Sequence, residues 1–146
     1  MNILCINGPN LNVLGKRDKR YYGNKTLAQI DALLNAEAKR LGVNIISFQS
    51  NSESEIIDFI QKNSSGAAGV IINPGALTHY GLSLRDALVD SALPVVEVHL
   101  SNIYSREDWR AKSVIAPISM GQISGFGWRG YMAALQILAG ELKADK

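Results

Sequence analysis

Short apolar runs that alternate with helical patterns are the feature that most limits how this chain can fold. The runs are rich in Val and Ile and alternate only in part with polar residues. This pattern is typical of strands that are covered on both faces. Four runs are clear and a fifth is weaker: Ile3 to Asn7, Asn44 to Gln49, Gly69 to Asn73, Val95 to Leu100, and the weaker Val114 to Ala116.

Helical patterns fill the intervals between these runs. Thr26 with Gln29 three residues later forms a capping box, and Gly42 supplies the stop signal of the same helix. Ser52 and Glu55 repeat the capping signature. The other expected helices are Leu82 to Val89, a short one that begins near Ser105, and a final one with Tyr131, Leu135, Leu138 and Leu142 on one face.

Repeated strand–helix units predict a parallel sheet with right-handed crossovers. Five strands in 146 residues indicate an α/β fold, a flavodoxin-like three-layer sandwich with a five-stranded parallel sheet. No internal repeat, low-complexity segment or linker interrupts the pattern, so we expect residues 1–146 to form a single domain.

The composition excludes several classes of protein. A net charge of +2 is too small to favour nucleic acid as a partner, and no apolar stretch approaches the length of a membrane span. Cys5 is the single cysteine, which rules out an internal disulfide and suits a reducing compartment. The first residues lack the features of a signal peptide, and we expect the protein to be cytoplasmic.

One connection is much longer than the others. Roughly eighteen residues separate the first strand from the first helix, whereas about 2–6 are usual. The segment holds three glycines, two tyrosines and a basic cluster at 16–20, which is equally typical of a solvated face. A connection of this length is either a functional lid or disordered, and we favour a lid at about residues 15–25.

Polar side chains gather where the expected strands end. In an open parallel sheet, ligands bind beyond the carboxyl ends of the strands. Each Asn taken singly is typical of a turn or a cap, but the coincidence of so many polar groups favours a site. These residues are Asn7, Asn10, Gln49, Ser50, Asn51, Asn73, Thr78, His79, Ser101 and Asn102.

Glu97 and His99 form the clearest pair at this edge. Two residues apart on a strand, they point to the same face. A carboxylate beside an imidazole fixes its tautomer and stabilises the imidazolium, which gives a proton donor usable near neutral pH. The alternative is a buried ion pair with a purely structural role.

Arg17 and Tyr22 form a second pair, within the expected lid. A phenol has a pKa of about 10, so it needs a nearby cation to act as a base. From spacing alone, a surface Arg and a packing Tyr are the more typical interpretation. The charges at Arg85, Asp86 and 106–110 are typical of exposed helices, although Arg110 lies close enough to the fourth strand to reach a ligand.

The segment 125–130 matches the dinucleotide fingerprint G-x-G-x-x-G, but no strand follows it in the sequence. We therefore expect these glycines to serve tight packing before the last helix. The spacing of His and Cys residues matches no metal site, and no phosphate-binding loop is present.

Taken together, the motifs resemble those of type II dehydroquinases over nearly the whole chain. The matching segments are Asn7-Gly8-Pro9-Asn10-Leu11-Asn12, Leu14 to Arg17, Tyr22-Gly23, Gln49-Ser50-Asn51, Ile72 to Ala76, Thr78-His79, Leu84 to Ala87, Glu97 to Asn102, Arg106-Glu107 and Gly125 to Tyr131. The departures are Asp18-Lys19 in the lid, Tyr80-Gly81, Tyr104 in place of a common His, and Lys112.

The resemblance implies a reaction: cofactor-free loss of water from 3-dehydroquinate to give 3-dehydroshikimate through an enolate. It makes Tyr22 the base, kept ionised by Arg17, and His99 the acid, oriented by Glu97, with Asn10 stabilising the enolate. The substrate-binding residues that it implies are Asn73, His79, Arg110, Leu100, Ser101 and, from a neighbouring subunit, Asp86. It also implies trimers that assemble into a dodecamer, and no metal.

Two other interpretations remain from the residue pattern. A flavodoxin-like binding or redox module would need a phosphate-binding loop rich in Ser and Thr after the first strand. A receiver-like signalling domain would need acidic residues there, where Asn7 and Asn10 stand instead. The implied reaction occurs both in aromatic biosynthesis and in quinate breakdown, so the residue pattern is compatible with either route.

Overall fold

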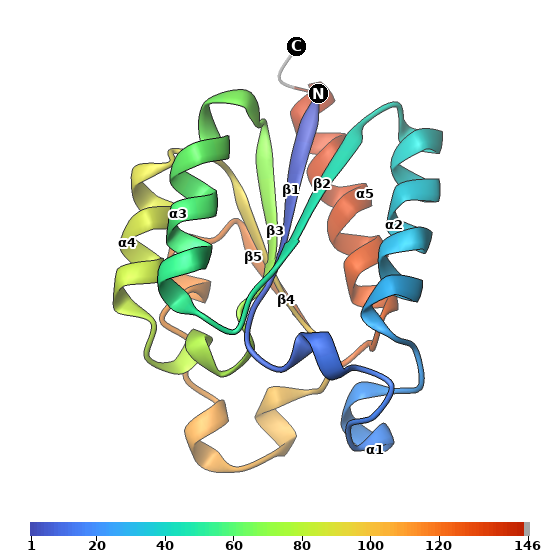
Figure 1. Ribbon diagram of the computed structural model, residues 1–146, viewed down its shortest axis with the longest axis vertical. Helices are drawn as coiled ribbons and strands as arrows, with labels where there is room; N and C mark the ends of the chain where they lie inside the picture. The colour runs from blue at the N-terminus through green and yellow to red at the C-terminus, as the bar shows by residue number, and fades with distance from the viewer. Residues whose placement is uncertain (145–146) are drawn as a thin grey trace.

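The computed structural model describes residues 1–144 and shows a three-layer α/β sandwich (Figure 1). All five strands are parallel and follow the order β2-β1-β3-β4-β5, which confirms the predicted flavodoxin-like fold. The strands are β1 (Asn2–Asn7), β2 (Asn44–Gln49), β3 (Gly69–Asn73), β4 (Val95–His99) and β5 (Gly121–Ser124).

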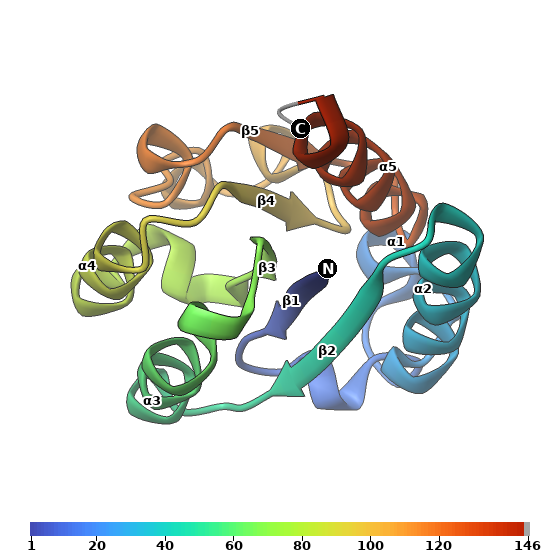
Figure 2. The ribbon, with the colours of Figure 1, turned by 90° about the horizontal axis from the view of Figure 1, so that it is seen from above.

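Two helices cover each face of the sheet, as the view from above shows (Figure 2). Helices α2 and α5 pack on one face and α3 and α4 on the other, so the apolar core has two halves. The central strands β1, β3 and β4 are buried almost throughout. The helices are α1 (Lys19–Tyr22), α2 (Leu27–Leu41), α3 (Glu53–Asn63), α4 (Leu82–Asp90) and α5 (Arg129–Ala144).

The predicted start and stop signals of α2 are confirmed. The Thr26 hydroxyl accepts a hydrogen bond from the backbone N–H of Gln29, and the Gln29 side chain accepts one from the Thr26 N–H. Gly42 ends the helix at φ 69°, a conformation that glycine adopts without strain. Ser52 caps α3 through the N–H of Glu55.

The prediction of a strand at Val114 to Ala116 was wrong. Ile115 is fully buried in the core half beside α3 and α4, so its hydrophobicity reflects packing rather than strand pairing. The fifth strand is β5, which lies at the edge of the sheet beside β4 and carries small and polar residues. Such an edge strand lacks the apolar run that marks a strand buried on both faces.

Two irregular segments lie near the carboxyl edge, one between β1 and α2 and the other between β4 and β5. The long connection after β1 is ordered and contains a 3₁₀ turn, Leu11–Val13, and α1, whose first turn is capped by Asp18. The short helix expected near Ser105 is instead a pair of 3₁₀ turns, Ile103–Ser105 and Asp108–Arg110. The other 3₁₀ turns are Ser64–Gly66, Gly75–His79 and Ala116–Ile118.

Among the helices of residues 1–144, none is both long and apolar enough to cross a membrane.

Candidate active site

A cavity of about 120 Å³ lies at the carboxyl edge of the sheet, where β1, β3 and β4 end. It is smaller than the roughly 300–1,000 Å³ typical of pockets for drug-sized molecules, so it suits a small metabolite. Three Arg and two His side chains line it, and its lining holds no carboxylate, so it favours an anion. The lining residues are Pro9, Asn10, Leu11, Arg17, Tyr22, Asn73, Gly75, Ala76, His79, His99, Leu100, Ser101, Ile103, Arg106, Trp109 and Arg110.

The cavity brings together nearly all the predicted site residues. Glu97 is the first exception, because it lies behind His99 and is fully buried. Asp86 is the second, since it is exposed on α4 and does not line the cavity. The role of Asp86 at the site of a neighbouring subunit, which the resemblance implies, stays a prediction.

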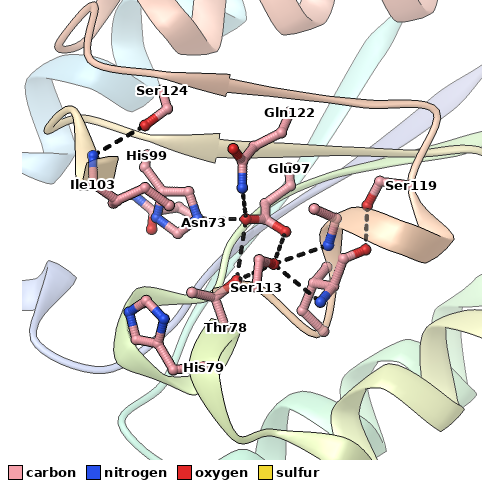
Figure 3. A network of polar contacts seen from close by, with 12 residues as sticks. Asn73, Thr78, His79, Glu97, His99, Ile103, Ser113, Ser119, Gln122 and Ser124 are labelled. Carbon is pink, nitrogen blue, oxygen red and sulfur yellow. Dashed lines mark hydrogen bonds and ion pairs between the residues drawn. The ribbon is translucent and has the colours of Figure 1, made fainter. Parts of the chain in front are cut away.

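His99 and Glu97 contact each other directly (Figure 3). The distance from His99 Nε2 to Glu97 Oε2 is 2.5 Å, and His99 is 6% exposed. Burial raises the pKa of the Glu97 carboxyl, but hydrogen bonds from His99 and from neighbouring polar groups outweigh burial and hold the pKa below its usual value. An ionised carboxylate is therefore held against the imidazole, as the sequence predicted.

The Glu97 carboxylate accepts hydrogen bonds from three other side chains besides its contact with His99. A carboxylate has about four acceptor positions, so the buried charge is fully satisfied. The donors are the hydroxyl of Thr78 (3.1 Å to Oε2), the hydroxyl of Ser113 (2.7 Å to Oε1) and the amide of Gln122 (2.6 Å to Oε2).

Tyr22 lies between two guanidinium groups. Its hydroxyl oxygen accepts hydrogen bonds from Arg17 Nη2 and from Arg106 Nη1, both at 2.9 Å. The guanidinium carbon of Arg17 also lies 3.7 Å from the centroid of the Tyr22 ring. Arg17 and Tyr22, for which spacing alone favoured a surface Arg and a packing Tyr, are therefore in direct contact within the cavity.

Arg106 is the main site residue that sequence reasoning missed. It was treated as one of several exposed charges, yet it also donates to the Ser101 hydroxyl at 3.0 Å and lies 4.0 Å over the Tyr21 ring. It therefore connects the lid to the end of β4. The available signal was its position in the matching Arg106-Glu107 motif, just after β4.

Tyr131 orients two amides beneath the cavity and was also missed. Its hydroxyl donates to Asn7 Oδ1 at 2.6 Å and accepts from Asn73 Nδ2 at 2.9 Å. Burial raises the pKa of the Tyr131 hydroxyl far above its usual range, so it remains a neutral donor. The Asn73 oxygen in turn accepts from the Gly75 N–H, which fixes this amide at the cavity wall.

His79 and Arg110 occupy the side of the cavity formed by the loops after β3 and β4. His79 Nδ1 lies 2.7 Å from the carbonyl oxygen of Lys112, which can only accept, so Nδ1 carries the hydrogen and Nε2 of the neutral ring is an acceptor. Trp109 packs edge-on against His79, and Arg110 pairs with Glu107 while stacking over Trp109.

Backbone contacts around glycines shape the cavity walls. The N–H groups of Gly125 and Gly127 donate to the carbonyl oxygens of His99 and Leu100, and a Cβ on Gly125 would lie 2.9 Å from Asn102 Cβ. The glycine motif before α5 thus serves close packing at the end of β4, as predicted.

In residues 1–144, no group of three or more His, Cys, Asp or Glu side chains is arranged to hold a metal ion.

A flavodoxin-like sheet whose carboxyl edge holds a small basic cavity, lined by a phenol and an imidazole, is typical of an enzyme that acts on a small anionic metabolite. Known proteins agree with this class. A sequence model described as "Dehydroquinase class II" matches residues 1–139. A 3-dehydroquinate dehydratase from Roseiflexus castenholzii is 55% identical over 140 residues, which cover 96% of this chain and 89% of that relative.

Solved structures give the same result. The type II dehydroquinase of Butyrivibrio crossotus superposes with a TM-score of 0.92 at 44% identity, covering 94% of this chain and 97% of that one. A 3-dehydroquinate dehydratase-like protein from Bifidobacterium longum reaches 0.73 at 28% identity, covering 98% of each chain. The chain belongs to the class II dehydroquinase family, which confirms the resemblance seen in its motifs.

Proposed function

We propose that this chain converts 3-dehydroquinate to 3-dehydroshikimate and water, with Tyr22 as the base and His99 as the acid. The observation that carries this proposal is the pair of guanidinium groups, Arg17 and Arg106, on the Tyr22 oxygen in the cavity that His99 also lines. Family membership supports the overall reaction, and the geometry supports the division of roles.

In the first step, the Tyr22 phenolate removes a proton from the carbon next to the ketone. The electrons of the broken C–H bond form an enolate, whose negative charge suits a cavity lined by cations. Asn10 lies at φ 70°, a left-handed conformation that Asn tolerates, and is held by a hydrogen bond from its N–H to the Asn51 side chain. Through a positioned water, it stabilises the enolate oxygen.

In the second step, the enolate reforms the ketone while the C–O bond to the leaving hydroxyl breaks. His99 donates its proton to that hydroxyl, which departs as water, and the new C=C bond is conjugated with the ketone. The ionised Glu97 beside Nε2 stabilises the charged imidazolium that this step requires. Tyr22 then loses its proton and His99 regains one, so the cycle needs no cofactor.

The remaining cavity residues are proposed to hold the substrate. Asn73, His79 and Arg110 contact its hydroxyls, since each presents a donor or an acceptor at the wall. The Leu100 and Ser101 region receives its carboxylate, and the nearby Arg106 supplies a compensating charge through Ser101.

Assembly completes the proposal. Asp86 lies on the exposed side of α4, and we assign it to the active site of a neighbouring subunit in a trimer, four of which form a dodecamer. The enzyme serves either aromatic biosynthesis or quinate breakdown, because both routes contain this dehydration.

Conversion of 3-dehydroquinate to a conjugated enone acid raises the ultraviolet absorbance, which gives a direct assay. The purified protein should show this rise without added cofactor, and Tyr22→Phe should reduce turnover by at least about 10³-fold, because a phenyl ring can take no proton. The matched control is Tyr21→Phe, which removes the hydroxyl of the neighbouring tyrosine and leaves Tyr22 intact. This variant should remain active. Normal turnover by Tyr22→Phe would show that Tyr22 is not the base.

A further inference from the structure

Gln122 occupies a specific place beside the Glu97–His99 pair. It lies on β5 directly opposite Glu97 on β4, so the two side chains share one face of neighbouring strands. Its Nε2 donates to Glu97 Oε2 at 2.6 Å, the same oxygen that contacts His99 Nε2. Figure 3 shows the Gln122 and His99 side chains reaching this oxygen from different directions.

Tyr104 holds the end of the Gln122 amide that faces away from Glu97. The Tyr104 hydroxyl donates to Gln122 Oε1 at 2.6 Å, so the amide oxygen is occupied and Nε2 points to the carboxylate. A flipped amide would place its oxygen against the carboxylate oxygen, which can only accept, and would lose the hydrogen bond to Glu97. The result is a continuous hydrogen-bonded line from the surface, where Tyr104 is 58% exposed, to the buried acid.

We propose that Gln122 and Tyr104 are positioning residues for the acid step: Tyr104 orients the Gln122 amide, and this amide holds the Glu97 carboxylate ionised and aimed at His99. The inference rests on the proposed function, in which His99 protonates the leaving hydroxyl. Neither residue lines the cavity, so they act on the rate of the chemical step and not on substrate binding.

The neighbours of Glu97 make its ionisation sensitive to this amide. Among residues 1–144, His99 on its own strand is the titratable group in contact with it, and Tyr104 stands one hydrogen bond farther away. The other contacts, Thr78 after β3 and Ser113 before β5, are neutral hydroxyls. A hydrogen bond to a charged group stabilises the charged form. Loss of the amide donor should therefore raise the pKa of the Glu97 carboxyl.

The test compares pH profiles of wild type and Gln122→Met, which keeps the length of the side chain and removes the donor. We expect the acidic limb of kcat to move up by about one to two pH units, because Glu97 is protonated more easily, while KM stays within about twofold. Gln122→Glu, which sets a second carboxyl beside Glu97, should move the limb in the same direction. Profiles that superimpose on wild type, or a change confined to KM, would overturn the proposal.

Gln136→Met is the matched control. Gln136 also donates its amide to a carboxylate, that of Glu37, at 2.8 Å, but on the exposed surface between α2 and α5. Its substitution should leave the profile unchanged. Tyr104→Phe should produce a smaller shift in the same direction, and in the Gln122→Met background it should add nothing, since it acts through that amide. Additive effects of the two substitutions would contradict the proposed order.

A readout without substrate separates this inference from the proposed function. The chain has only two histidines, so its ring-nitrogen NMR signals can be assigned by comparison with His79→Gln. Gln122→Met should displace the His99 signals and their titration, while those of His79, which is held by Lys112, remain in place. Unchanged His99 signals would refute the positioning role even if the dehydration is confirmed, and displaced signals would support it even if turnover fails.

Discussion

At the scale of single residues, the oxygen of Tyr22 is the point where the lid meets the rest of the molecule. Arg17 comes from the lid itself, whereas Arg106 comes from the loop after β4 and also contacts Ser101. The hydroxyl of the proposed base is therefore held from both segments at once. Arg106 joins Tyr22 to the end of β4 through Ser101.

Substitution of Arg106 tests the importance of this contact. Arg106→Ala removes one of two charge-assisted hydrogen bonds to the Tyr22 oxygen, each worth roughly 1.5–3 kcal/mol, so kcat should fall about 10- to 100-fold. Arg106→Lys keeps the charge but cannot reach both Tyr22 and Ser101 with one planar group, and should recover only part of the loss. Steady-state kinetics at several pH values measures both. Full activity in Arg106→Ala would show that Arg17 alone is enough.

Glu97 should make folding stability depend on pH. Because its pKa is lower in the folded protein than the usual 4.5, its ionised form stabilises the fold above about pH 4.5, and this contribution is lost as the pH falls through the folded value. Glu97→Gln should therefore lower the free energy of unfolding by roughly 1–3 kcal/mol at pH 7 and by progressively less below pH 4.5. Urea unfolding at each pH provides the measurement. If the difference in unfolding free energy between wild type and Glu97→Gln stayed constant down to pH 3, the ionised carboxylate would not be the source of the stabilisation.

At the scale of elements, the ends of β1 and β3 approach each other so closely that only a glycine fits between them. The Gly8 N–H donates to the Asn73 carbonyl oxygen at 2.8 Å, and a Cβ on Gly8 would lie 2.4 Å from the backbone oxygen of Pro74. This contact sets the distance between Asn10 and Asn73 across the cavity.

Gly8→Ala should therefore damage both fold and site. The added methyl group meets backbone atoms that cannot rotate away, so we expect a loss of about 1–3 kcal/mol in stability and a large fall in kcat. Gly66→Ala is the control, since its Cβ would meet no atom within 4 Å, and it should be neutral or slightly stabilising. Thermal unfolding and turnover should be measured for both. If the two variants had the same thermal stability and turnover, the close approach of β1 and β3 would not require a glycine at position 8.

At the scale of the whole molecule, the single chain presents an active-site cavity without a carboxylate in its lining and an exposed Asp86 elsewhere. Large apolar side chains are also exposed, including Phe126 at 70% and Leu82 at 61%, the latter on the same helix as Asp86. These features support the proposed trimer and dodecamer, in which a neighbour supplies Asp86.

Light scattering after size exclusion should give a mass of about 190 kDa, twelve times the 15.8 kDa chain. Asp86→Asn should preserve this mass and reduce kcat, because we propose that this exposed carboxylate acts at a neighbour's site. A monomeric active enzyme, or a fully active Asp86→Asn, would contradict the shared site.

The sequence by itself determined the fold class, the caps of α2 and α3, and the Glu97–His99 pair. These depend on local periodicity: two residues apart on a strand share a face, and a capping box spans three residues. Only the tertiary structure decided the position of β5, which has no apolar signature, and the contacts of Arg106, which lies 84 positions from Tyr22 in sequence. The same is true of Gln122, set beside Glu97 by the register of two strands. Such contacts depend on how elements pack against each other, and the pattern within one element does not record them.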